Sequence, residues 1–291
     1  MSHPTLDASG FLPGTPVDYV SKASGSPVSI PPESIIEVIV NTNEYLSHPT
    51  FFADAEFEFY ETIGQRNLSG FIGEVFVKFF EQTVDGYTLN PHADGRPDIL
   101  DLSTDEAAAY YERECFKPGK RRQLPVRKNL APFKFGGLEV KATIGDPVAK
   151  KAKERLFKER NVSGFSVGMP RIDFLKSFTY WGHHTSCENL IGLYYDYVPE
   201  LESSPQVMLA MHAELDAKLG WGKVSLGRST SKKTSNTSVT KTARQSLYRN
   251  VVAVTAESRY LERLREVGLS VPSGSTGKQL ELGLRAEAAP S

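Results

Sequence analysis

Two short segments carry side chains that together could bind a divalent metal ion and attack a phosphodiester. One holds Asp98, and the other holds Glu139 and Lys141 with Val140 between them. Because successive side chains of a strand point to opposite faces, Glu139 and Lys141 project together while Val140 points to the other face. Asp98, at the start of a neighbouring strand, can reach the same point. The pattern predicts two carboxylates and an ammonium at one sheet edge.

Phosphodiester hydrolysis needs such a set, because Mg²⁺ prefers oxygen ligands and often takes only one or two protein carboxylates. We expect Asp98 and Glu139 to be those ligands, with the backbone carbonyl of Val140 as a third. The metal would polarise a phosphoryl oxygen and lower the pKa of bound water. Lys141 would orient or help to deprotonate that water, stabilise the developing negative charge and offset the repulsion between the carboxylates.

The flanking sequence predicts the strands that must hold these residues. Three apolar residues at 99, 100 and 102 indicate a short strand that begins near Asp98. A Gly-Gly pair precedes a second apolar strand over residues 138–144. Asp94 and Asp101 lie on either side of Asp98 and remain alternative metal ligands.

Two helices are expected beside these strands. Aromatic and aliphatic residues recur at helical spacing over residues 66–82, which predicts an amphipathic helix that carries Glu74. After the second strand, Asp146 is placed to cap a helix and Pro147 to occupy its first position. This helix is expected to run to about residue 160, with a strongly basic exposed side.

Pro97-Asp98 followed by Glu139-Val140-Lys141 resembles the signature of the PD-(D/E)xK nuclease superfamily, above all the type II restriction endonucleases. The resemblance covers roughly residues 70–200. It implies an α/β fold with a restriction-endonuclease-like core, in which a mixed central β-sheet is flanked by helices and carries DNA-contacting insertions. Members often have a glutamate on a helix upstream of the aspartate, where it binds a second metal or supports the lysine, and Glu74 fits that place.

The same resemblance implies an activity and its partners. It implies Mg²⁺-dependent, sequence-specific hydrolysis of double-stranded DNA that leaves 5′-phosphates. A homodimer would cut a symmetric site, because two-fold protein symmetry matches palindromic DNA. A cognate DNA methyltransferase would be a genetic partner and not a physical one. A repair or junction nuclease with the same core, or a non-catalytic DNA-binding protein, remains an alternative.

The net charge of −1 hides a strong asymmetry along the chain. Residues 1–114 contain 19 acidic and 5 basic residues, whereas residues 115–291 contain 16 acidic and 29 basic ones. Two stretches, 115–138 and 217–256, contain no acidic residue at all. A basic region of this kind indicates a polyanionic partner, here double-stranded DNA.

These acid-free stretches supply the expected DNA contacts. Arg and Lys can bind guanine, and Asn and Gln can bind adenine, while phosphate contact is an alternative for each of them. The segment 225–249 is the best candidate for reading sequence. The expected DNA-binding residues are Arg121, Arg122, Lys128, Arg228, Lys232, Lys233, Asn236, Lys241, Arg244, Gln245 and Arg249.

The remaining sequence suggests one domain between two flexible ends. Residues 1–32, rich in Pro, Ser and Gly, are expected to form an extended or poorly ordered arm, and residues 272–291 a flexible tail. The domain covers residues 33–271, with a catalytic core at about 70–200 and a basic region at about 218–250. Further expected elements are helices over 34–46, 105–115, 205–219 and 258–267, strands over 174–181, 190–198 and 251–255, and loops over 117–134 and 225–242.

Other protein classes find little support in the sequence. No apolar run approaches the roughly 18 residues of a membrane span, so we expect no membrane contact. Two cysteines do not make a disulfide framework, which fits a reducing cytoplasm. The resemblance to restriction endonucleases implies that this is the cytoplasm of a bacterial or archaeal cell. His183, His184 and Cys187 lack a second ligand pair at the spacing of a structural zinc site.

Overall fold

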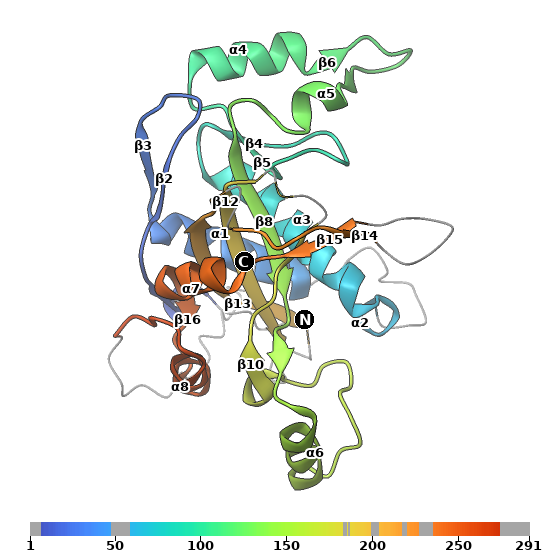
Figure 1. The fold of residues 1–291 in the computed structure, drawn as a ribbon, viewed down its shortest axis with the longest axis vertical. Helices are drawn as coiled ribbons and strands as arrows, with labels where there is room; N and C mark the ends of the chain where they lie inside the picture. The colour runs from blue at the N-terminus through green and yellow to red at the C-terminus, as the bar shows by residue number, and fades with distance from the viewer. Residues whose placement is uncertain are drawn as a thin grey trace, which may run out of the picture.

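A seven-stranded mixed sheet forms the centre of the fold (Figure 1). The computed structural model describes residues 7–47, 59–182, 185, 187–198, 204–216, 220–226 and 235–273. Across the sheet, the strands are β1 (Phe11–Pro13), β16 (Val251–Thr255), β13 (Pro205–Glu214), β12 (Asn189–Tyr197), β8 (Gly137–Thr143), β5 (Ile99–Asp101) and β4 (Tyr87–Leu89). Neighbouring strands are antiparallel except β12 and β8, which run parallel. The expected mixed central sheet flanked by helices is therefore confirmed.

Helices α1 (Pro32–Ser47) and α3 (Gln65–Thr83) pack against each other and against β13 and β8. Both present an apolar stripe, because residues such as Ile35, Ile39, Ile72 and Phe76 recur at helical spacing and are fully buried. Burying each such side chain stabilises the fold by about 1.5–3 kcal/mol. The side chain of Asn43 also bonds both the N–H and the carbonyl of Val207 in β13. These helices match the predicted segments 34–46 and 66–82.

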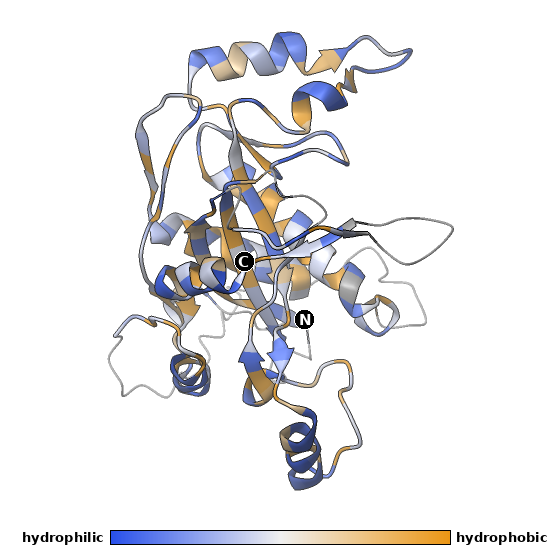
Figure 2. Ribbon diagram, viewed as in Figure 1, coloured by the Kyte–Doolittle hydropathy of each residue, from blue (hydrophilic) through white to orange (hydrophobic). Residues whose placement is uncertain are grey.

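Helix α7 (Lys241–Arg249) lies against β13, and α8 (Ser258–Val267) follows β16 directly. Figure 2 shows apolar residues concentrated in the central strands and polar residues on the outer helices. The predicted strands 190–198 and 251–255 and the predicted helices 105–115 and 258–267 all form. No helix of the described residues has the length and apolar character needed to cross a membrane.

The predicted helix over residues 205–219 is wrong. Residues 205–214 form strand β13, which lies between β12 and β16 and is buried on both faces up to Ala213. A strand covered on both faces shows a continuous apolar run, and its sequence cannot be distinguished by periodicity from that of a buried helix. Long-range pairing, not local propensity, decides its structure.

The expected arm over residues 1–32 is wrong for residues 8–30. After a 3-10 turn η1 (Ala8–Gly10), β1 pairs with β16 at the sheet edge, and β2 (Val17–Val20) forms a hairpin with β3 (Pro27–Ile30). Phe11, Val17 and Ile30 are buried in the core. The Pro, Ser and Gly residues mark the turns between these short strands, so composition alone gave a misleading picture of the segment.

The helix expected to start at Asp146 begins later. Residues Asp146–Pro147 form β9, which pairs with β10 (Leu175–Ser177), and α6 covers Lys150–Glu159. The Asp146 carboxylate accepts hydrogen bonds from the hydroxyls of Ser177 and Thr179 and caps no helix. The Asp146 carboxylate thus bonds to hydroxyls that are distant in the sequence and not to the backbone N–H groups of a following helix.

Short elements interrupt the predicted strand 174–181 and the loops 117–134 and 225–242. At one end of the molecule, α4 and the segments that follow it enclose a second, smaller core that is rich in aromatic residues (Figure 1). Its buried members are Leu100, Ala107, Cys115, Leu130, Phe133 and Phe135. Within the described residues the remaining elements are α2 (Phe59–Thr62), α4 (Asp105–Glu114), β6 (Phe116–Lys117), β7 (Leu124–Pro125), α5 (Arg127–Leu130), η3 (Ile172–Phe174), β11 (Trp181–Gly182), β14 (Ser225–Leu226) and β15 (Ser235–Ser238). Residues 227–234 and the tail from 274 onward lie outside the described residues.

Candidate active site

Strands β5 and β8 pair only briefly, and the candidate site lies where they separate. Their register pairs Ile99 with Leu138 and Leu100 with Gly137. Asp98 therefore directly precedes the first paired residue of β5, and Glu139 directly follows the last residue of β8 that pairs with β5. On its other side β8 continues in parallel register with β12 from Glu139 to Thr143, so the strand stays within the sheet after it leaves β5.

Lys141 lies at the centre of the site. Its Nζ is 2.6 Å from Glu139 Oε1, 3.1 Å from Asp98 Oδ2 and 2.9 Å from the carbonyl oxygen of Val140. The backbone N–H of Val140 also donates to Asp98 Oδ2 at 2.8 Å, which fixes that carboxylate toward β8. The Glu139 side chain is 1% exposed, and those of Lys141 and Asp98 are 24% and 32% exposed. The site is thus closed beneath Glu139 and open to solvent at Asp98.

The three oxygens that converge on Lys141 Nζ are the three expected to hold a metal. Two carboxylates and one carbonyl are a sufficient protein contribution for Mg²⁺, which usually keeps several waters. No group of three or more His, Cys, Asp or Glu able to hold a metal ion occurs among the described residues. The two carboxylates and the carbonyl of this site match the ligands of a partly hydrated Mg²⁺. In the structure, the Lys141 ammonium supplies the positive charge where these oxygens meet.

The electrostatics of the site reflect this crowding of charges. Burial raises the pKa of the Asp98 carboxyl, and repulsion from Glu139 adds to the effect, although Lys141 and the Val140 N–H oppose it. Burial alone would lower the pKa of Lys141, but its two carboxylate neighbours outweigh burial and raise it. Lys141 is therefore held as a cation in this arrangement.

Glu74 projects from α3 toward the same charges. Burial raises the pKa of its carboxyl, the negative charge of Asp98 raises it further, and Lys141 lowers it. These influences place Glu74 within electrostatic reach of the site. The structure thus brings Asp98, Glu139 and Lys141 into direct contact, and places Glu74 on the helix that packs against β8, within electrostatic reach of them.

The alternative ligands are positioned elsewhere. Asp101 is fully buried, and its carboxylate accepts hydrogen bonds from the hydroxyls of Ser21, Tyr19 and Ser103 and from the Ser103 N–H. It holds the β2–β3 hairpin against β5. Asp94 is exposed and its nearest cation is Arg127, 3.6 Å away. Asp98 is therefore the aspartate that meets Lys141.

One residue of the site was missed by the sequence reasoning. The Cys187 thiol is buried and donates to Glu139 Oε2 at 3.0 Å, while its carbonyl accepts from the Trp221 indole at 3.1 Å. Burial, then the charge of Glu139, raise the pKa of this thiol well above its usual value. The sequence offered only two neighbouring histidines as a signal, and His183 and His184 lie outside the described residues.

The expected DNA-binding residues within the described chain fall in four separate places. Arg121 and Arg122 are exposed between β6 and β7, and Lys128 is exposed on α5. Asn236 lies on β15 and is partly exposed. On α7, an exposed face carries three residues spaced by four, Lys241, Gln245 and Arg249. Arg244 of the same helix is half-buried. Arg228, Lys232 and Lys233 lie outside the described residues.

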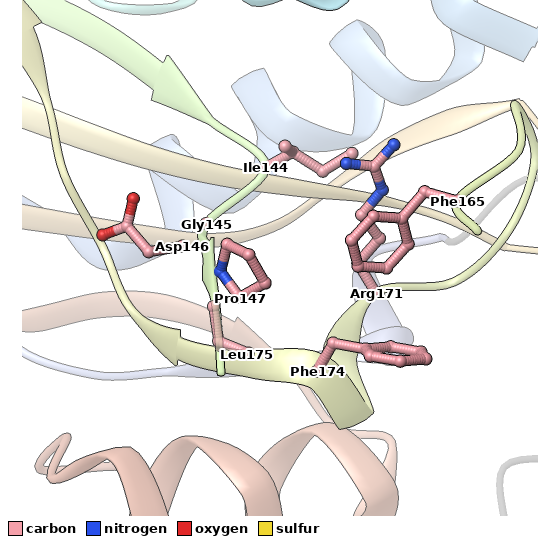
Figure 3. Close-up of a pocket in the computed structure, with 8 residues that line it drawn as sticks. All are labelled: Ile144, Gly145, Asp146, Pro147, Phe165, Arg171, Phe174 and Leu175. Carbon is pink, nitrogen blue, oxygen red and sulfur yellow. The ribbon is translucent and has the colours of Figure 1, made fainter. Parts of the chain in front are cut away.

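A small pocket lies beyond the end of β8 and is separate from this site (Figure 3). The Arg171 guanidinium stacks 4.3 Å from the centre of the Phe165 ring, beside Pro147 and Phe174. None of the four candidate catalytic residues lines this pocket. Its walls combine apolar side chains with the charged groups of Asp146 and Arg171, and the Phe157 ring of α6 contacts two of its aromatic residues, Phe165 and Phe174.

The chain matches no protein-family model and has no significant match among curated proteins or solved structures. The geometry of the site is therefore what bears on function.

Proposed function

We propose that this protein is a Mg²⁺-dependent DNA endonuclease of the type II restriction class, built on a restriction-endonuclease-like core. One observation carries the proposal: Asp98 Oδ2, Glu139 Oε1 and the Val140 carbonyl converge on the ammonium of Lys141. Two carboxylates and a lysine gathered where two strands diverge, with Glu139 fully buried, favour a functional role, because removing a carboxylate from water is costly.

Each residue of the site has a distinct task in this proposal. Asp98, Glu139 and the Val140 carbonyl would hold Mg²⁺, which when bound supplies Lewis acidity at the phosphoryl oxygen and acidifies water. Lys141 would donate to the attacking water or the phosphoryl oxygen and offset negative charge as it develops. Glu74, on the open side, would support Lys141 or a second metal ion.

The DNA would lie across the side of the sheet that Lys141 faces. Exposed basic residues on α7 and between β6 and β7 would supply phosphate contacts. A sequence-specific enzyme of this class would act as a homodimer on a symmetric site, in the cytoplasm of a bacterial or archaeal cell. A cognate DNA methyltransferase would protect the host sequence and would be encoded nearby.

The test is digestion of a plasmid of known sequence with Mg²⁺, followed by sequencing of the DNA ends. We expect cuts at one short sequence, with 5′-phosphates. Asp98→Ala and Lys141→Ala should each abolish cutting and leave duplex binding largely intact. Asp94→Ala is the matched control, because Asp94 is a nearby exposed carboxylate outside the site and its loss should leave cutting unchanged.

Other outcomes separate the alternative functions. Cuts that follow DNA structure and not sequence would identify a repair or junction nuclease with the same core. Duplex binding without any Mg²⁺-dependent cutting would identify a non-catalytic DNA-binding protein. Continued cutting by the Asp98→Ala, Lys141→Ala double variant would refute the assignment of the site.

A further inference from the structure

Strand β11 crosses the face of the sheet that carries the candidate catalytic residues. Gly192 of β12 is the register partner of Lys141, so both lie on the same face of the parallel pair. The ring of Tyr180 rests on Gly192 so closely that a Cβ at this glycine would lie 2.7 Å from the ring. Tyr180 is 1% exposed. The residue just before β11 is thus anchored beside Lys141.

Trp181, the next residue, extends in the opposite direction. Because side chains alternate along an extended chain, burying Tyr180 against the sheet directs Trp181 to solvent. Its exposed fraction of 63% is the largest among the exposed bulky apolar residues of the described chain. A single exposed apolar residue is ordinary on a protein surface, but a rigidly placed indole above a catalytic strand is not explained by folding.

The neighbours of Trp181 identify the chemistry of its partner. In β15, Ser238 pairs with Trp181 and Thr237 pairs with Gly182, and β15 passes across β8 in the view of Figure 1. Helix α7 begins three residues after Ser238 and exposes Lys241, Gln245 and Arg249. The indole therefore has the Ser238 side chain as its cross-strand neighbour, and the chain that pairs with it leads directly into a helix with exposed basic and amide side chains. Such surroundings suit a polyanion that also carries flat apolar rings.

We propose that the indole of Trp181 stacks on a nucleobase of DNA bound at the active site. The inference rests on the proposed nuclease function and names a contact that function does not require. The electron-rich face of an indole repels phosphate but stacks well on any base. In a duplex, an apolar side chain can enter between base steps and kink the helix, and Trp181 is exposed enough to do so.

The test uses the fact that the chain has two tryptophans, Trp181 and Trp221. Trp221 is 4% exposed, so only Trp181 can contact DNA directly. With Ca²⁺ in place of Mg²⁺ to prevent cutting, duplex binding is followed by anisotropy of a labelled DNA and by tryptophan emission. We expect duplex to quench the emission of the wild type, and Trp181→Phe to abolish the quenching while binding persists.

Affinity and position provide the second readout. Trp181→Ala should weaken duplex binding by about 5- to 100-fold, the range of a lost base–aromatic stack, and Trp181→Phe by less. Val20→Ala, at another exposed apolar residue on the β2–β3 hairpin, is the matched control and should bind normally. A 2-aminopurine base moved along the duplex should respond to wild type at one position and lose that response with Trp181→Ala.

The results that would overturn the stacking contact differ in scope. Duplex binding with unchanged tryptophan emission, or with equal affinity in Trp181→Ala, would refute the stacking contact and leave the nuclease proposal standing. Failure of the folded wild type to bind any duplex would refute both. Quenching that depends on protein concentration without DNA would show that a second copy of the chain, and not a base, covers Trp181.

Discussion

Removal of the central ammonium should destabilise the fold in a way that Mg²⁺ reverses. In Lys141→Ala, Glu139 keeps a carboxylate that is 1% exposed but loses the cation 2.6 Å away, and Asp98 loses the same partner. Breaking a fully buried ion pair costs about 3–5 kcal/mol. Because Lys141 and Asp98 are about a quarter and a third exposed, solvent screening reduces the expected cost to about 2 kcal/mol.

The assay is urea unfolding and thermal melting in EDTA and in Mg²⁺. In EDTA, Lys141→Ala should lose about 2 kcal/mol, or roughly 4 °C in melting temperature. Saturating Mg²⁺ should restore this stability, because ligand at about 100 times its dissociation constant adds about 2.7 kcal/mol. Lys78→Ala is the matched control, since Lys78 bonds Glu81 at 2.7 Å on the exposed side of α3 and should cost under about 1 kcal/mol.

A double variant tests the cause of the loss. Lys141→Ala with Glu139→Gln removes the buried charge together with its partner, so it should be more stable in EDTA than Lys141→Ala alone. It should also lose the response to Mg²⁺. Equal stability of Lys141→Ala and wild type in EDTA would refute the electrostatic account, and recovery of the double variant by Mg²⁺ would refute Glu139 as a ligand.

Two further predictions concern buried groups with shifted pKa values. Burial lowers the pKa of His212 to about 4, with Asp18 opposing the shift, so the unfolded chain takes up this proton first as the pH falls. Stability should therefore be full above pH 6.5 and decline by about 3 kcal/mol toward pH 4, and His212→Met should flatten that decline in urea titrations at each pH. Cys187→Ala should raise the Mg²⁺ concentration needed for half-maximal cutting, because it frees the carboxylate that the thiol orients. Cys187→Ser keeps a donor and should restore the wild-type value; equal defects in both variants would show that the thiol acts only through packing.

The site could be predicted from the sequence because its parts are local. Glu139 and Lys141 share a strand, and strand alternation alone places them on one face. Asp98 needed one further assumption, that its strand lies beside β8, and the register of Ile99 with Leu138 meets it. The choice between Asp98 and Asp101 needed the hairpin of residues 17–30, which composition had suggested was an unstructured arm.

The elements that were predicted wrongly are those decided by distant partners. The sequence of β13 is as compatible with a buried helix as with a strand, and its pairing with β12 and β16 decides the outcome. Asp146 stands where a helix cap is expected, but its carboxylate accepts hydrogen bonds from Ser177 and Thr179 instead. Cys187 is 48 residues from Glu139, and no local pattern connects them. Sequence periodicity reports which face of an element is buried, but not what covers it.

The parallel register of β12 with β8 explains why the covering elements matter for function. Gly192 stands beside Lys141, and any larger residue there would displace the Tyr180 ring that rests on it. Without that anchor, β11 and its partner β15 would lose their position on the face of the sheet that carries Lys141. Because Gly192 has no side chain, Tyr180 can rest on it, and this contact fixes the adjacent Trp181 relative to Lys141. A base bound at Trp181 would then be held in a defined position relative to the scissile phosphate.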